Sequence, residues 1–301
     1  MLTHSLRSFD GTRLTVFEGG NPDGPPIVLA NGLGGNVGSW RHLIAGLGET
    51  HRILCWDYRG LYASDPAVDG VSYAIEHHAL DLAAVIDGFE LESPTLCGWS
   101  MGVQVSLEFL RNRPNGAGSM IAINGTPGHP FRTAFGANLH AQMQRAFAFS
   151  ERHWMKATWA LPYARRKTVV RIFMKTVQVV GLANSRLDAQ VFKDLAFEFA
   201  ELDIGVYSRI FNHLGEHDAT DVLPHVQVPA LLIGGDRDKM TPLHRTLLMA
   251  ARIPNSELVT IRGGTHFSPV EFPNRINREI SRFLEQNASA SDSEVALAAS
   301  A

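Results

Sequence analysis

The chain has 301 residues, of which 45% are hydrophobic and 19% are charged, with a formal net charge of -3. These values are typical of a globular protein with a sizeable core, and they argue against a nucleic acid as partner. No segment reaches the roughly 18 apolar residues of a membrane span, and the N-terminus lacks the features of a secretory signal. We therefore expect a soluble, cytoplasmic protein.

The strand pattern starts with a hairpin, because polar and apolar residues alternate in Leu6–Asp10 and Arg13–Glu18 around a turn at Gly11. Short continuous apolar runs follow, which predict strands buried on both faces of a parallel sheet. These runs are Pro26–Ala30, Arg52–Trp56, Pro94–Gly98, Ser119–Ile123, Pro229–Ile233 and Ser256–Ile261. Cys55 and Cys97 lie inside such runs, so we expect buried, unpaired thiols.

Helical periodicity fills the intervals between these runs. The predicted helices are Trp40–Leu47, Ala74–Phe89, Gly102–Asn112, Leu243–Ala251 and Asn274–Glu285. Strands that alternate with helices predict an α/β fold with a doubly wound, mostly parallel sheet. We assign residues 1–126 and 221–286 to this core domain.

Between Thr126 and Asp221 the pattern is helical only, with predicted helices at Phe135–Phe149, Ala164–Val180 and Asp188–Phe211. We expect residues 127–220 to form an all-helical cap inserted into the core domain. Residues 287–301 are rich in alanine and serine and have no apolar face to bury, so we expect a disordered tail.

A single serine lies between a predicted strand and a predicted helix, in Gly98-Trp99-Ser100-Met101-Gly102. Glycines at the flanking positions let the strand and the helix approach closely, which a sharp strand-to-helix turn requires. Such a turn holds the Ser100 hydroxyl at the end of the sheet. The alternative interpretation is a purely structural turn serine.

A serine nucleophile needs a base, an orienting carboxylate and oxyanion donors. His266 follows the last strand, and Asp238 follows the strand before it. The carboxyl ends of parallel strands share one rim, so the three side chains are expected to meet. Asp236 competes for the carboxylate role, but its place directly after Gly235 suits it to stabilising the turn.

A glycine-rich loop, Asn31-Gly32-Leu33-Gly34-Gly35, follows the run Pro26–Ala30. Such a loop lets the backbone N–H of Leu33 turn toward Ser100 and join the N–H of Met101. Two backbone N–H groups suffice to stabilise an oxyanion.

Together with the segment Asp57–Asp65, these motifs resemble the α/β-hydrolase family, and the resemblance extends from the opening hairpin to Glu285. The resemblance implies these roles: nucleophile for Ser100, general base for His266, orienting carboxylate for Asp238, and oxyanion donors for Leu33 and Met101. No metal and no cofactor is expected.

Three positions depart from the pattern of this family. Asn31 stands where many members have histidine, Tyr62 where glycine is usual, and Val103 where a second glycine often follows the turn. Asn31 and Tyr62 are placed to reshape the pocket beside the glycine loop. We expect Asn31, Trp99 and Phe267 to contact the substrate.

Two rival patterns fit less well. Gly32-x-Gly34-x-x-x-Gly38, with Asp57 after the next strand, imitates a dinucleotide site, but that fold has no place for the hairpin or for the serine set. His213-x-x-Glu216-His217 matches a zinc-protease pattern. Gly215 inside that helix is unfavourable, and no third ligand motif is evident, so we expect a structural segment.

The sequence therefore predicts a serine hydrolase that cleaves a small hydrophobic carboxylic ester through an acyl-enzyme, acting as a monomer or homodimer. A thioesterase, lactonase, perhydrolase or carbon–carbon bond hydrolase would use the same residues, and a non-catalytic receptor of the same fold is the alternative of another class. The hydrophobic preference rests on aromatic residues of the expected cap: Phe135, Phe147, Phe149, Trp154, Trp159, Phe173, Phe192, Phe197 and Phe199.

Overall fold

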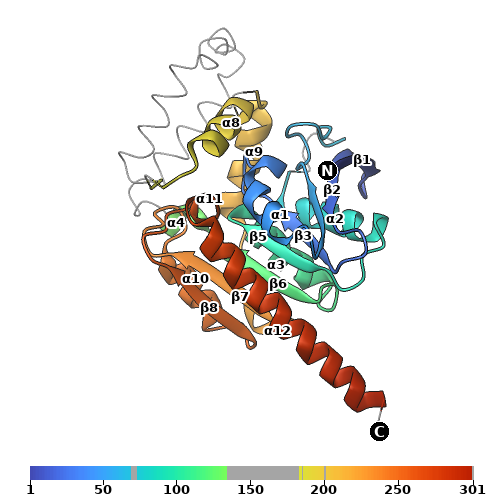
Figure 1. Ribbon diagram of the computed structural model, residues 1–301. Helices are drawn as coiled ribbons and strands as arrows, with labels where there is room; N and C mark the ends of the chain where they lie inside the picture. Colours follow the sequence, from blue (N-terminus) through green and yellow to red (C-terminus); the bar gives the residue numbers. More distant parts are fainter. Residues whose placement is uncertain (69–72, 134–182, 185, 200, 300–301) are drawn as a thin grey trace.

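The computed structural model describes residues 1–68, 73–133, 183–184, 186–199 and 201–299 (Figure 1). An 8-stranded sheet has the order β1-β2-β4-β3-β5-β6-β7-β8, in which β1, β2 and β4 pair antiparallel and the strands from β4 to β8 pair parallel. The strands are β1 Leu2–Arg7, β2 Arg13–Gly20, β3 Pro26–Ala30, β4 Arg52–Trp56, β5 Thr95–Trp99, β6 Ser119–Ile123, β7 Ala230–Gly235 and β8 Ser256–Ile261. The predicted α/β class with a mostly parallel sheet is confirmed.

The central strands bury both of their faces. Along β3 the side chains of Ile27 and Leu29 enter one hydrophobic core, whereas that of Val28 enters the other. This alternation follows from the two-residue period of a strand. It explains why the sequence shows continuous apolar runs here. Cys55 and Cys97 are buried and unpaired, as expected.

Helices cover the two faces of the sheet. Side chains of α2 (Ile75–Gly88), α3 (Met101–Asn112) and α10 (Leu243–Ala250) pack into the core that contains Val28. Those of α1 (Arg41–Leu47) and α12 (Pro273–Ala299) pack into the core on the opposite face, and Figure 1 shows both helices in front of the sheet. Two short helices, η1 (Val37–Trp40) and α11 (Ser268–Glu271), lie in loops.

The strand order reverses between β3 and β5, which pair in parallel with Ala30 opposite Gly98. The chain passes from β3 to β4 on one side and returns to β5 on the other, so the loops after β3 and β5 diverge. In open α/β sheets, such a switch point creates a crevice at the carboxyl ends of the strands. The glycine loop follows β3 and Ser100 follows β5, so both lie at this switch point.

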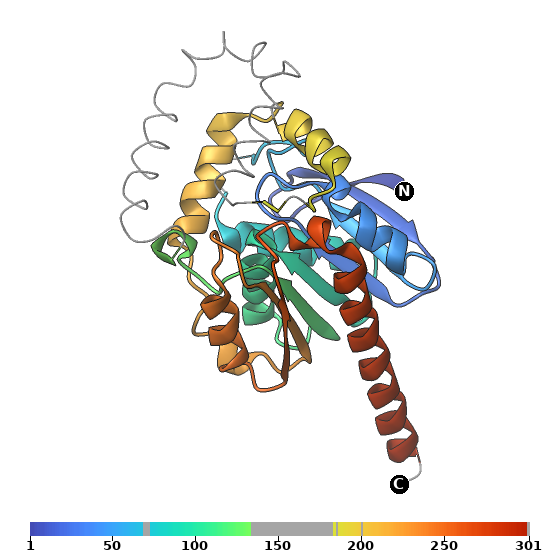
Figure 2. The ribbon, with the colours of Figure 1, turned by 60° about the vertical axis from the view of Figure 1, so that its left-hand side comes forward.

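The described helices of the expected cap are α4 (Pro130–Thr133), α8 (Ala189–Phe199) and α9 (Ile204–Glu216), and the short helix η4 (Leu223–His225) follows at the return to the core domain. Figure 2 shows α8 and α9 beyond the carboxyl end of the sheet. The single helix expected at Asp188–Phe211 is interrupted because Asp203 caps α9, its carboxylate accepting from Gly205 N (2.7 Å) and Val206 N (3.1 Å). The helices expected at 135–149 and 164–180 lie outside the described residues.

The last helix extends further than expected. Its last fully buried side chain is Phe283, which is 1% exposed, yet the backbone of α12 continues helical to Ala299 instead of becoming disordered after Gln286. Alanine, glutamate and leucine favour helix, so local propensity continues the helix where burial stops. Figure 2 shows this end projecting away from the sheet. No helix in the described part of the chain has the length and apolar character needed to cross a membrane.

Candidate active site

Ser100 lies between β5 and α3 in a strained backbone conformation, with φ of 56° and ψ of -113°. The two flanking glycines allow it, since a Cβ on Gly98 would lie 2.4 Å from Gly102 O and one on Gly102 would lie 2.0 Å from Ala30 O. The Ser100 N–H donates to Ile123 O at 3.0 Å. This turn fixes the serine at the carboxyl edge of the sheet, as its sequence context predicts.

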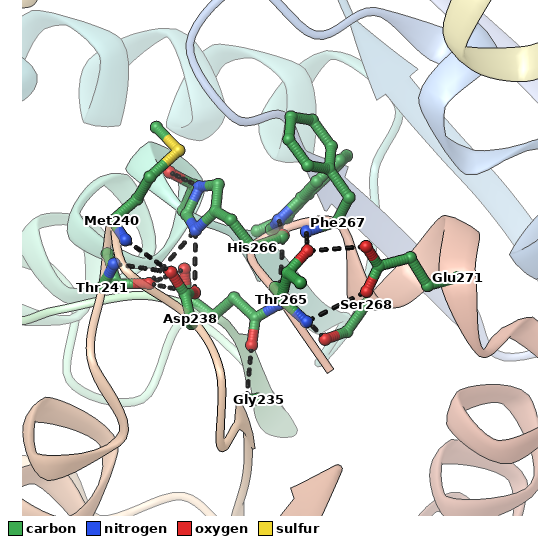
Figure 3. Close-up of polar contacts among 12 residues, drawn as sticks. Gly235, Asp238, Met240, Thr241, Thr265, His266, Phe267, Ser268 and Glu271 are labelled. Carbon is green, nitrogen blue, oxygen red and sulfur yellow. Dashed lines mark hydrogen bonds and ion pairs between the residues drawn. The ribbon is translucent and has the colours of Figure 1, made fainter. Parts of the chain in front are cut away.

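The structure brings Ser100, His266 and Asp238 into one hydrogen-bonded chain. His266 Nε2 lies 2.9 Å from Ser100 Oγ, and His266 Nδ1 lies 2.8 Å from Asp238 Oδ2, a contact visible in Figure 3. Asp238 and His266 are each 5% exposed. A neutral imidazole that donates from Nδ1 to the carboxylate presents the lone pair of Nε2 to the serine hydroxyl.

The two candidate carboxylates play different parts. Asp236 Oδ1 accepts from Gly263 N at 2.7 Å and so joins the turns after β7 and β8. Asp238 Oδ1 accepts from the N–H groups of Met240 (2.7 Å) and Thr241 (2.8 Å), which leaves Oδ2 to face His266. The geometry agrees with the preference for Asp238.

The glycine loop folds into a tight turn beside the serine. Gly35 N donates to Gly32 O at 2.9 Å, and Gly34 has φ of 78°, as the third position of a type II turn requires. A Cβ on Gly32 would lie 3.4 Å from Ser100 Cβ. Within the described part of the chain, the N–H groups of Leu33 and Met101 have no hydrogen-bond acceptor. Both are thus available to a ligand.

The expected substrate contacts of Asn31 and Trp99 require correction. Asn31 is fully buried, and its side chain donates to Trp56 O (2.9 Å) and accepts from Trp40 Nε1 (2.6 Å), so it braces the base of the glycine loop. Trp99 is 4% exposed and donates from Nε1 to His266 O at 2.9 Å. Its indole therefore holds the loop that carries His266.

Phe267 packs edge-on against Trp99, with ring centroids 6.1 Å apart. It is only partly buried and adjoins His266, also edge-on, at 6.1 Å. Its place agrees with a wall of the site, and its contact with substrate remains a prediction.

Asn124 and Thr241 belong to the site although the sequence did not single them out. Asn124 Nδ2 donates to the carbonyls of Thr265 (2.9 Å) and His266 (3.0 Å), and its Oδ1 accepts from Gly235 N at 2.9 Å. Thr241 Oγ1 lies 2.7 Å from Asp238 Oδ2 and 3.3 Å from His266 Nδ1. These side chains tie the aspartate turn to the histidine loop.

Glu271 is a further missed residue. Its buried carboxylate accepts from Thr265 N (2.9 Å) and from Thr265 Oγ1 (2.6 Å) (Figure 3), and it also accepts from Asn184 N (2.6 Å). It thereby joins the residue before His266 to Asn184 of the expected cap. The only available signal was a carboxylate a few residues after the histidine on the same loop.

The zinc-protease pattern forms no metal cluster within the described residues. His217 packs between α9 and α3, with Nδ1 2.6 Å from Gln104 Oε1 and Nε2 3.1 Å from Glu108 Oε2. The described residues contain no cluster of three or more His, Cys, Asp or Glu that could hold a metal. Burial raises the pKa of the Cys97 thiol well above its usual range, so this thiol near Ser100 stays protonated and unreactive.

Comparisons with known proteins agree with this geometry. Residues 25–273 match the model of the alpha/beta hydrolase fold. The chain is 24% identical to the 3-oxoadipate enol-lactonase 2 of Acinetobacter baylyi, covering 89% of this chain and 91% of the relative. It is 27% identical to the protein assigned as carbamate hydrolase RutD in Pseudomonas syringae pv. syringae, covering 87% and 94%.

Solved structures show the same fold. A bromoperoxidase from Bacillus anthracis superposes with a TM-score of 0.78 at 18% identity, covering 94% of this chain and 100% of the other. The esterase EaEST from Exiguobacterium antarcticum gives 0.77 at 20% identity, also covering 94% and 100%. The expectation of an α/β-fold hydrolase is confirmed. The chain belongs to the α/β-hydrolase fold family.

Proposed function

We propose that this protein hydrolyses small hydrophobic carboxylic esters through a covalent intermediate on Ser100. The observation that carries the proposal is the chain of contacts from Ser100 Oγ to His266 Nε2 (2.9 Å) and from His266 Nδ1 to Asp238 Oδ2 (2.8 Å). Distances of this size permit proton transfer along the path that acyl transfer requires.

In the first half-reaction, Ser100 Oγ attacks the ester carbonyl carbon while His266 Nε2 takes the hydroxyl proton. The carbonyl electrons move to oxygen, where the N–H groups of Leu33 and Met101 donate to the oxyanion. The intermediate collapses, the carbon–oxygen bond of the alcohol breaks, and His266 returns the proton to the departing alkoxide. The Asp238 carboxylate stabilises the imidazolium.

In the second half-reaction, water replaces the alcohol as the nucleophile. His266 takes a proton from water, the hydroxide adds to the acyl carbon, and Ser100 leaves with the proton from His266. The products are a carboxylic acid and an alcohol.

Apolar surroundings support a hydrophobic substrate. Phe199 on α8 and Tyr207 on α9 lie over the glycine loop, since a Cβ on Gly34 would meet their rings at 2.8 Å and 3.3 Å. Each methylene that a substrate buries against such surfaces contributes about 0.8 kcal/mol. Six of the nine aromatic residues expected to line the cap lie between 134 and 182, outside the described residues.

The test is kcat/KM across p-nitrophenyl esters from acetate upward. We expect kcat/KM to rise over the first few methylenes and no turnover in Ser100→Ala. Ser106→Ala is the matched control, because its hydroxyl only donates to Gly102 O within α3 (2.8 Å) and its loss should leave the rate unchanged. A flat profile, a preference for anionic acyl groups or activity in Ser100→Ala would contradict the proposal.

A lactone is the second candidate, because a relative that aligns over 89% of this chain is named as an enol-lactonase. Lactone hydrolysis breaks the same acyl–oxygen bond, so the same residues would serve. A higher kcat/KM for a γ-lactone than for the open-chain ester of the same acid would favour this candidate over the first.

A further inference from the structure

Two tyrosine hydroxyls from the segment after β4 hold the glycine loop. Tyr58 donates to Asn31 O at 2.7 Å, and Tyr62 donates to Gly34 O at 2.5 Å. These two carbonyls lie on opposite sides of Leu33. The loop is therefore pinned at both ends of the turn that presents the Leu33 N–H beside Ser100.

Tyr62 makes its contact from an unfavourable backbone conformation. Its φ is 52°, in the left-handed region that favours glycine. A bulky aromatic residue with positive φ persists only where its surroundings hold it in place. The hydrogen bond to Gly34 is the contact that a glycine at position 62 could not make.

The contact acts on the turn as a whole. The Gly34 carbonyl and the Gly35 N–H belong to one planar peptide, and this N–H donates to Gly32 O, which shares a second peptide with the Leu33 N–H. By holding the Gly34 carbonyl, Tyr62 anchors this hydrogen-bonded pair of peptides to the segment after β4. The tilt of the turn is then fixed, and with it the direction of the Leu33 N–H.

The surroundings of Tyr62 keep its hydroxyl a donor. Burial and the carboxylates of Glu198 and Asp57 raise the pKa of Tyr62 well above its usual range, so the hydroxyl stays protonated. On the cap side, the ring of Phe199 covers Gly34 so closely that no side chain fits there. Gly34 thus lies between Tyr62 of the core domain, which holds its carbonyl, and the ring of Phe199 on α8.

We propose that Tyr62 is a positioning residue that aims the Leu33 N–H at the developing oxyanion, and that it therefore acts on the rate of the chemical step and not on substrate binding. This proposal rests on the proposed function, since it needs an oxyanion on an acyl group bound to Ser100.

The test compares Tyr62→Phe with Tyr73→Phe in the full-length protein. Tyr73 belongs to the same connection between β4 and α2, but its hydroxyl accepts from Ala67 N (3.3 Å), away from the glycine loop. Loss of a whole oxyanion donor lowers kcat by about 100- to 1000-fold, so a misaligned donor should lower it by about 10-fold. With p-nitrophenyl butyrate as substrate, we expect this fall in kcat in Tyr62→Phe and not in Tyr73→Phe, with KM unchanged.

A second readout separates positioning from folding. A trifluoromethyl ketone adds to Ser100 and places an oxyanion in the hole, so its inhibition constant should rise in Tyr62→Phe by the same factor as kcat falls. The corresponding secondary alcohol forms no oxyanion and should bind both proteins equally. Melting temperatures of the two variants identify any loss that comes from unfolding.

Several outcomes would overturn the proposal: an unchanged kcat in Tyr62→Phe, a rise in KM alone, unchanged ketone inhibition, or an equal loss in Tyr73→Phe. These results would leave the proposed function intact if the wild-type protein hydrolyses the ester. A wild-type protein that neither hydrolyses the ester nor reacts with a fluorophosphonate would overturn the proposed function, and this proposal with it.

Discussion

Two loops meet at the carboxyl edge of the sheet, and they are held in different ways. The loop of His266 is fixed by side chains that are themselves buried and charged or amide-bearing, namely Glu271, Asn124 and Asp238. The glycine loop is fixed by its own backbone turn and by hydroxyls of Tyr58 and Tyr62 that reach its carbonyls.

The difference reflects what each loop has to present. The ring of His266 must keep one orientation while it takes up and gives back a proton. Carboxylate and amide partners hold that orientation best. Leu33 presents only a backbone N–H, whose direction is set by peptide geometry, so pinning the neighbouring carbonyls suffices. The side chains that hold the two loops can be substituted one at a time, and the substitutions are expected to change stability or activity to different extents.

The largest effect on stability is expected from Glu271→Gln. The neutral amide places an NH2 group against buried donors that now point at a carboxylate, at a cost of about 4 kcal/mol in the free energy of unfolding. Urea unfolding measures this cost. The matched control is Glu257→Gln on β8, a half-exposed partner of Arg282 (2.7 Å), which should change stability by less than about 1 kcal/mol. Equal effects would contradict the role given to Glu271.

A pH effect is expected from Asp57, which lies beneath the segment that carries Tyr58 and Tyr62. Burial raises the pKa of Asp57 from 3.8 to about 6; an accepted hydrogen bond from Ala63 N opposes this shift, and the charge of Glu198 adds to it. The folded protein therefore keeps the proton in a window where the unfolded chain has lost it. Between about pH 4 and pH 6 the free energy of unfolding should fall as pH rises, by about 3 kcal/mol.

The asparagine side chain in Asp57→Asn cannot ionise, so the free energy of unfolding of this variant should not fall in that way as pH rises. Relative to wild type, the variant should gain about 3 kcal/mol between pH 4 and pH 7 in urea unfolding. For Asp87→Asn the pH-dependent change in the free energy of unfolding relative to wild type should have the opposite sign, because the Arg113 guanidinium lowers the pKa of Asp87. Parallel pH profiles for wild type and Asp57→Asn would refute the assignment.

A smaller effect, on activity alone, is expected from Thr241→Val. The variant loses the hydroxyl that contacts Asp238 Oδ2 and His266 Nδ1, and kcat should fall by about 10-fold, or about 1.4 kcal/mol. Thr246→Val is the control, because the buried Thr246 hydroxyl has no partner within the described residues. A fall in kcat shared by both variants would indicate a general packing effect.

The smallest effect is expected from removing the chain after Gln286, which supports neither loop. The last side chain of α12 in the core is Phe283, so the free energy of unfolding should change by less than about 0.5 kcal/mol. Ending the chain at Glu279 instead removes Ile280 and Phe283 from the core and should unfold the protein. A marked drop in melting temperature for the chain that ends at Gln286 would mean that the end of α12 packs against the rest of the protein.

The sequence predicted most of the sheet, because burial on both faces leaves continuous apolar runs that few other structures produce. It also predicted the meeting of Ser100, Asp238 and His266, since each follows a strand and parallel strands share one edge. Trp99 shows the limit of such reasoning. It adjoins Ser100 in the chain, but its buried side chain donates to the carbonyl of His266.

The residues that hold the two loops were not predictable in the same way. Asn124, Glu271 and Tyr62 act on backbone groups of distant segments, and no local pattern in the sequence records which carbonyl or N–H a side chain will reach. The expected substrate contact of Asn31 has to be corrected for the same reason. Its position beside the glycine loop was predictable, but its commitment to Trp40 and Trp56 depends on packing.

The central claim is that Ser100 forms the covalent bond to the acyl group, and reaction with a fluorophosphonate followed by peptide mass mapping tests it most directly. The account predicts one adduct per chain, on the peptide that contains Ser100, with activity lost in proportion to labelling and no adduct in Ser100→Ala. An adduct on another residue, or equal labelling of Ser100→Ala, would contradict it.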